Sequence, residues 1–113
     1  MDSIVHLLQA THASCVAVKN LSKENKIKLL LRLADLLLEN QTEIIQENKK
    51  DLDKMQDSDP KKDRLLLNEN RIQDLANSLH DIVKLDDPTN KILSDKHLEN
   101  GLHILKITVP IGV

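Results

Sequence analysis

The most regular pattern of apolar residues in the chain lies at residues 27–38. Its members recur at steps of three and four residues, the spacing that places side chains on one face of a helix. This face consists of Ile27, Leu30, Leu31, Ala34, Leu37 and Leu38. A second stripe beside it adds Leu29, Leu33 and Leu36. The pattern therefore predicts a helix, capped by Ser22 and ending near Glu39, that packs against neighbours on more than one side.

Further helical segments surround this one. Ser3 is a candidate N-cap for a first helix over residues 4–19. Asn68 is a candidate N-cap for the last and most clearly amphipathic helix, which ends at residues 86–88. The inward positions expected in the first are Ile4, Leu7, Leu8, Cys15 and Val18. Those expected in the last are Ile72, Leu75, Ala76, Leu79, Ile82 and Val83.

Two shorter elements are expected between these helices. After a break at residues 40–42, a third helix is marked by Ile44, Ile45, Leu52 and Met55. Asp59 is then expected to cap a short helical turn that begins at Pro60 and runs to residues 65–67.

The period changes after Pro88, where apolar residues alternate along residues 102–109 and Pro110 ends the strand. The dipeptide Asn100-Gly101 is typical of a two-residue hairpin turn, with the incoming strand near residues 91–98. We therefore expect a mainly α fold of about four to five helices with a C-terminal β-hairpin. The helical region would be residues 1–88 and the hairpin arm residues 89–113, together a single incomplete domain.

The expected hairpin would need a partner. Two strands alone are marginally stable in water, and an apolar strand presents an unpaired edge to other strands. Either another subunit supplies the missing strands, or the sequence is the front part of a longer protein.

Composition narrows the possible functions. Lys and Arg total 16 against 18 Asp and Glu, so the net charge of −2 offers no general attraction to nucleic acid or to an anionic membrane. Phe, Tyr and Trp are absent, which leaves an aliphatic core and no ring on which a base could stack. No apolar run approaches the roughly 18 residues of a membrane span. The two glycines cannot supply a dinucleotide fingerprint or a P-loop.

Residues with catalytic or metal-binding chemistry form no recognisable site. Cys15 has no partner for a disulfide, fits a reducing cytoplasmic compartment, and is interpreted as a small core residue rather than a nucleophile. The aspartates of residues 51–63 lack the glycine and the ligand spacing of a calcium loop. His80 is expected to be packed or at the rim of the core, and no pairing is found for His6, His12, His97 and His103. We therefore predict no catalytic, cofactor-binding or metal-binding residue.

Several short motifs, taken in order, resemble one enzyme family over essentially the whole chain. They comprise the Leu-rich stretch 28–40, Glu43-Ile44-Ile45, Asn48-Lys49-Lys50-Asp51, Asp63-Arg64-Leu65 with Leu67, Arg71-Ile72, Asp87-Pro88, Asn100-Gly101-Leu102 and Val109-Pro110-Ile111-Gly112-Val113. Each is weak alone, but their order and spacing resemble the N-terminal region of gamma-glutamyl phosphate reductase, also called glutamate-5-semialdehyde dehydrogenase, in the aldehyde dehydrogenase superfamily.

The resemblance implies an activity that these residues do not carry by themselves. Enzymes of this family use NADPH and a cysteine thiolate to reduce L-glutamate 5-phosphate to the 5-semialdehyde in proline biosynthesis. The family chain continues beyond the motif at residues 109–113 to its cofactor loop and nucleophile, and Cys15 does not match the catalytic position. The resemblance therefore implies the N-terminal part of an α/β oxidoreductase, inactive alone and without its own cofactor.

The same resemblance implies that the hairpin is part of an arm that pairs with a neighbouring subunit or with the remainder of the enzyme. A second hypothesis is a stand-alone helical interaction module that uses its hairpin edge to add strands to a partner's sheet. A helix-turn-helix DNA binder is disfavoured because the helix after Asn68 mixes Glu69, Asp74 and Asp81 with Arg71 and Lys84.

Overall fold

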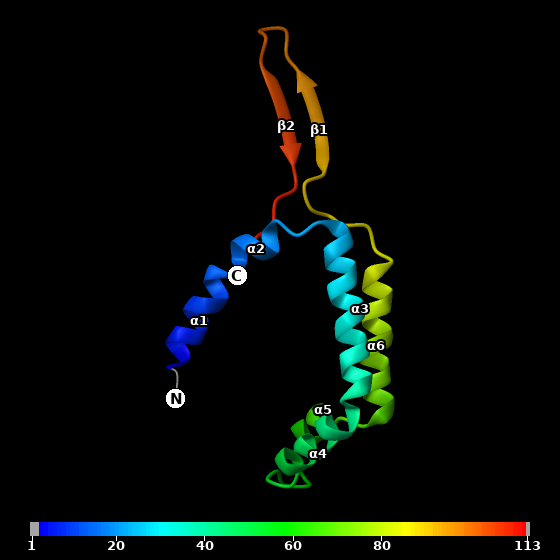
Figure 1. Ribbon diagram of the computed structural model, residues 1–113. Helices are drawn as coiled ribbons and strands as arrows, with labels where there is room; N and C mark the ends of the chain where they lie inside the picture. Colours follow the sequence, from blue (N-terminus) through cyan, green and yellow to red (C-terminus); the bar gives the residue numbers. More distant parts are fainter. Residues whose placement is uncertain (1–2, 113) are drawn as a thin grey trace. The chain divides into compact units, whose positions relative to one another are not determined.

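The fold consists of helices followed by a β-hairpin, in a computed structural model that describes residues 3–112 (Figure 1). Over that range the helices are α1 (Ile4–Ala13), α2 (Cys15–Lys19), α3 (Lys23–Glu39), α4 (Gln41–Leu52), α5 (Lys61–Leu65) and α6 (Glu69–Val83). The strands are β1 (Ile92–His97) and β2 (His103–Ile107), which pair antiparallel. The predicted mainly α class with a C-terminal hairpin is confirmed. Val113, the last residue of the expected arm, lies outside the described residues, as do Met1 and Asp2.

The chain folds as two compact units. One unit joins α1 and α2 to the hairpin, and the other is Glu24–Leu85, which contains nearly all of α3 together with α4, α5 and α6. Within residues 3–112, none of the helices combines the length and apolar character that a membrane crossing requires.

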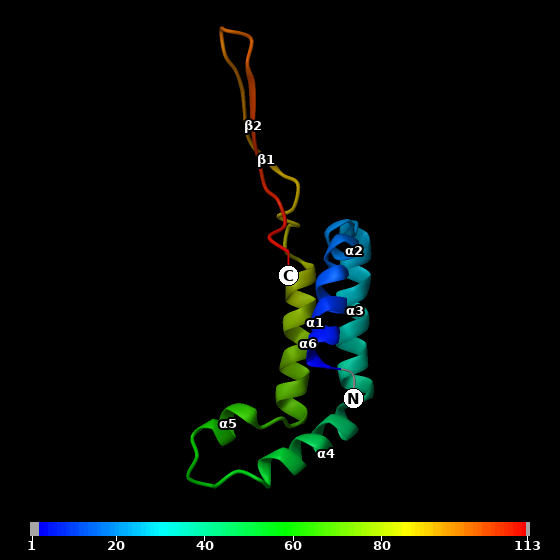
Figure 2. The ribbon, with the colours of Figure 1, turned by 90° about the vertical axis from the view of Figure 1, so that its left-hand side faces the viewer.

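The core of the Glu24–Leu85 unit lies between α3 and α6. These helices run antiparallel and side by side in both views (Figures 1 and 2). Ala34 of α3 and Ile72 and Ala76 of α6 are fully buried. Two of these three residues are alanines, so Ile72 is the one large side chain among them. Of the face that the sequence predicted for α6, Ile72 and Ala76 are fully buried, whereas Leu75 and Ile82 are 46% and 48% exposed, so the predicted inward face is only partly buried.

The second apolar stripe of α3 is only partly covered. Leu29, Leu33 and Leu36 are 56%, 42% and 38% exposed, so the prediction of packing on more than one side is wrong for this structure. Ala34 is fully buried and the other apolar residues of the first stripe are half-buried, whereas the second stripe is open to solvent.

Side-chain caps fix where several helices begin. The Ser3 hydroxyl accepts a hydrogen bond from Val5 N at the start of α1, and Asn68 Oδ1 accepts one from Arg71 N at 2.9 Å at the start of α6. Both predicted caps are confirmed. Asp59 Oδ1 accepts from Lys61 N at 2.9 Å, so it caps the short turn as expected, although the regular part of α5 begins at Lys61.

Two boundaries differ from those the pattern predicts. The expected single helix over residues 4–19 is interrupted at Ser14, whose hydroxyl donates to the Thr11 carbonyl at 2.6 Å and so competes with the helical hydrogen bonds there. The large apolar residues of this segment that were expected to point inward are exposed. Ile4 and Leu8, for example, are 74% and 64% exposed. α4 ends at Leu52, before Met55, since the backbone turns tightly after Asp51.

The hairpin turn is longer than predicted. Leu98 N donates to Leu102 O, and Gly101 N donates back to Leu98 O at 3.0 Å. The loop therefore contains Glu99 as well as Asn100 and Gly101, with Gly101 at φ 86°. This is the type I turn followed by a left-handed residue that is common in three-residue hairpins, so the expected two-residue turn is wrong.

Register is regular near the turn and shifts at the base of the hairpin. Asp95 pairs with Leu105 and His97 with His103, whereas Ile92 pairs with Ile107. Leu93 is therefore the extra residue of a β-bulge. Bulges pin the register of a strand pair, so the pairs nearer the turn are held in one alignment.

Candidate functional site

Three side chains with metal-ligating or proton-transferring chemistry meet on one face of the hairpin. Asp95 and His97 are two residues apart on β1 and so point to the same face, and His103 of β2 lies directly opposite His97. Leu98 N donates to Leu102 O, which makes the next pair, His97 and His103, a non-hydrogen-bonded pair with closely spaced side chains. The hairpin register alone brings this cluster, Asp95–His97–His103, together.

The geometry of the cluster is tight. The two imidazole rings stack with centroids 4.0 Å apart and planes inclined by 12°. His103 Nε2 lies 2.6 Å from Asp95 Oδ1, and His97 Nε2 lies 3.7 Å from the same oxygen. One ligand atom from each residue lies within 4.8 Å of the others, and all three residues are exposed. The arrangement can hold a cation or share a proton among three groups.

Sequence reasoning found no pairing for either histidine. The length of the turn is the feature of the sequence from which the pairing of His97 with His103 could have been predicted. Once a three-residue loop is placed at Glu99–Gly101, counting outward aligns Leu98 with Leu102 and His97 with His103. A two-residue turn at Asn100-Gly101 would instead place Glu99 opposite Leu102 and shift every pair.

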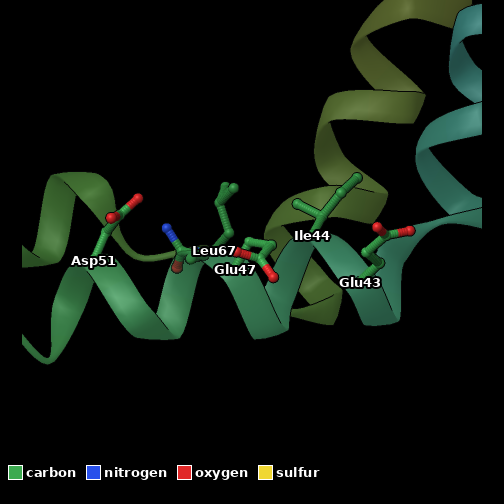
Figure 3. A pocket seen from close by; sticks show the side chains of 6 residues that line it. Glu43, Ile44, Glu47, Asp51 and Leu67 are labelled. Carbon is green, nitrogen blue, oxygen red and sulfur yellow. The ribbon is translucent and has the colours of Figure 1, made fainter.

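A second feature is an open hollow of about 420 Å³ in the Glu24–Leu85 unit (Figure 3). It lies along α4 and is lined by Glu43, Ile44, Glu47, Asn48, Asp51 and Leu67. Its carboxylates follow the helix in steps of four residues rather than converging, and none of them belongs to the metal-ligating group found among residues 3–112. The hollow is a solvated groove beside α4, and it supplies no convergent set of reactive groups.

The remaining candidates have structural roles. Asp57 pairs with Lys62 at 2.6 Å and Asp63 with Arg71 at 2.9 Å, which agrees with a polar break rather than a calcium loop. The hydrogen bond and charge of Lys62 lower the pKa of Asp57. His80 is exposed in the last turn of α6. Cys15 is half-buried, and a Cβ built on Gly112 would lie 3.1 Å from its sulfur.

The hairpin also offers free edges and apolar side chains. Its sheet contains only β1 and β2 within the described chain, so each strand leaves one backbone edge unpaired. Its large apolar side chains, from Ile92 to Val109, are between 42% and 65% exposed. Such a ribbon is suited to pairing with a further strand.

Comparison with known proteins relates this fold to one enzyme. No protein-family model matches the chain. The chain is 37% identical over 112 residues to gamma-glutamyl phosphate reductase of Chlorobaculum parvum and 40% identical over 110 residues to that of Legionella pneumophila strain Lens. The crystal structure of gamma-glutamyl phosphate reductase from Thermotoga maritima matches 97% of the chain with a TM-score of 0.87 at 26% identity.

The chain is homologous to the N-terminal portion of gamma-glutamyl phosphate reductase. The resemblance seen in its motifs is thereby confirmed. The matches cover 97% to 99% of this chain but 26% to 27% of the relatives, so the chain spans about a quarter of their length.

The described residues contain no glycine-rich turn of the kind that holds a dinucleotide phosphate. A dinucleotide phosphate is usually held by a glycine-rich turn at the N-terminus of a helix. Gly101 lies in the hairpin loop and Gly112 beside Cys15, and neither precedes a helix.

Proposed function

We propose that the chain supplies the N-terminal portion of a cytoplasmic gamma-glutamyl phosphate reductase in proline biosynthesis. The complete enzyme would reduce L-glutamate 5-phosphate to L-glutamate 5-semialdehyde with NADPH. The observation that carries the proposal is the TM-score of 0.87 over 97% of the chain, together with 37% to 40% identity to curated relatives. A similarity in both sequence and backbone over the whole chain supports a shared role, not only a shared fold.

We further propose that these 113 residues do not catalyse the reaction alone. Cys15 follows the break at Ser14, is half-buried and lies beside Gly112, which suits a packed thiol better than an exposed nucleophile. The positions of Gly101 in the hairpin loop and of Gly112 beside Cys15, neither at the start of a helix, support this proposal. The contribution of the chain would be structural. Its helices would pack on the rest of the enzyme, and its hairpin would pair with the rest of the enzyme or with a like subunit.

The exposed surface supports this structural role. Leu29, Leu33 and Leu36 on α3 and the apolar residues of the hairpin are open to solvent, and they would be covered by the remainder of the enzyme. The free edges of β1 and β2 can accept a strand through backbone hydrogen bonds.

A chimera tests the proposal. The chain replaces the matching portion of the Legionella pneumophila reductase, to which it is 40% identical, in a bacterial strain that lacks its own reductase and requires proline. We expect growth without proline, and NADP⁺ reduction by the purified chimera with semialdehyde and phosphate. Deletion of the same portion should abolish both, because the apolar surface that it covers would be exposed.

The Cys15→Ser form of the chimera is the matched control and should keep its activity. A folded chimera without activity would contradict the shared role and favour the stand-alone interaction module. Turnover by the isolated chain would contradict its proposed inactivity, and loss of activity in the Cys15→Ser chimera would contradict the structural assignment of that thiol.

A further inference from the structure

We propose that Asp95, His97 and His103 form a binding site for a divalent ion of the zinc class at the tip of the hairpin. The ion would be held by Nε2 of both imidazoles and by a carboxylate oxygen, with water in the open position. This site goes beyond the proposed function, since it uses a face of the hairpin and strand pairing uses its edges.

The spacing of the ligand atoms suits such an ion. They lie within 4.8 Å of one another, and two of the pairs are 2.6 Å and 3.7 Å apart. Zn–N and Zn–O bonds of about 2.0–2.1 Å place tetrahedral ligands roughly 3.3 Å apart. Small rotations of the side chains therefore make the site, and the backbone stays where it is.

The hairpin holds the ligands in advance of binding. His97 and His103 are fixed opposite each other by the backbone ladder between the Glu99–Gly101 loop and the bulge at Leu93. Both Nε2 atoms turn toward Oδ1 of Asp95. A set of ligands that already converges loses little conformational entropy on binding, which favours affinity.

The types of ligand set the choice of ion. Two imidazoles and one carboxylate suit zinc, nickel and copper, whereas magnesium and calcium prefer oxygen ligands throughout. All three residues are exposed, so an ion can enter directly and keep a bound water.

Calorimetric titration of the full, tag-free chain with zinc chloride tests the site. We expect one ion per chain, and the same stoichiometry from the visible absorption of added cobalt(II). His97→Asn, His103→Asn and Asp95→Asn should each weaken binding by about tenfold or more, because even the outer partners of metal ligands contribute roughly 10- to 100-fold. Magnesium chloride should produce no binding heat at the same concentration.

Two variants serve as matched controls. His80→Asn removes an exposed histidine on α6, and Cys15→Ser removes the thiol, and neither should change the zinc affinity. Circular dichroism checks that each variant keeps its fold. In wild-type chain, NMR imidazole signals of His97 and His103 should shift on zinc addition while that of His80 does not.

Several results would overturn the site. Equal zinc affinity in the wild-type chain and in the His97→Asn/His103→Asn double variant would do so. Loss of binding only in Cys15→Ser would assign the ion to the thiol. If the His97 and His103 signals did not shift at saturating zinc, the cluster would not bind the ion. None of these outcomes bears on the chimera, so the two proposals fail independently.

Discussion

At the scale of single residues, Asn48 connects α4 to the segment that leads into α6. Its Nδ2 donates to Leu65 O at 2.9 Å, and its Oδ1 accepts from Leu67 N at 2.8 Å. The amide thus takes the place of a strand partner for an extended stretch of backbone. Arg71 holds the same stretch from the other side, donating to Leu66 O at 2.9 Å and to the Asp63 carbonyl.

Replacing Asn48 with alanine should therefore destabilise the Glu24–Leu85 unit. Leu67 N is part-buried and would lose its partner, which costs about 1–3 kcal/mol. Urea unfolding followed by far-ultraviolet circular dichroism measures the change, since the chain has no aromatic residue for fluorescence. Asn77→Ala is the matched control, because the Asn77 side chain accepts an exposed hydrogen bond from Gln73 Nε2 at 3.1 Å within the same helix. An equal, small effect of both substitutions would show that Asn48 does not hold the segment.

The pKa of the Asp86 carboxyl group depends on its contact with Lys91. The hydrogen bond from Lys91 Nζ at 3.1 Å, its charge and that of Lys23 hold the pKa of Asp86 below its ordinary value. The contact stabilises the fold above the pKa of unfolded Asp86, and this contribution is lost as pH falls through the lowered pKa of the folded state.

Lys91→Ala should raise the pKa of Asp86 toward its ordinary value, as measured by carboxyl NMR titration. The pKa of Asp81, which the hydrogen bond and charge of Lys84 lower, should stay the same and is the internal control. An unchanged pKa of Asp86 would mean that Lys91 does not make this contact in solution.

At the scale of elements, the pair of α3 and α6 depends on very few buried side chains. Ile72 is the one large side chain among the fully buried residues of the described chain. Ile72→Ala should lower the free energy of unfolding by about 2–5 kcal/mol, since it removes buried methyl groups and leaves a cavity.

Leu75→Ala on the same helix is the control for Ile72→Ala, because Leu75 is 46% exposed and its loss creates no closed cavity. Its effect should be clearly smaller in the same urea experiment. If both substitutions had equal effects, the interface between α3 and α6 would not be the core of this unit.

The elements also show what a sequence pattern can predict. The position of α6 and its Asn68 cap were predicted because helical period and capping depend on neighbouring residues. Exposure of Leu29 and Leu33 was not predicted, since the width of an apolar stripe does not say what covers it. The break at Ser14 arises from one side-chain hydrogen bond that has no periodic signal.

At the scale of the whole molecule, the similarity to the reductase could be predicted from the sequence, and the hairpin cluster could not. Short motifs spread over the chain point to the reductase, and the relatives confirm the similarity over 97% to 99% of the chain. His97 and His103 are separated by the loop, and whether they pair across the strands depends on the length of the turn. Asn100-Gly101 suggested a two-residue turn, and the one extra residue, Glu99, decides which side chains face each other.

The close approach of Gly112 to Cys15 has a practical consequence. Cys15 is the chain's single thiol, and a Cβ at residue 112 would already crowd its sulfur. A maleimide adduct needs far more room than one methyl group, so we expect alkylation of Cys15 to displace the neighbouring backbone at Gly112. The half-buried thiol should therefore be alkylated more slowly than a fully exposed one.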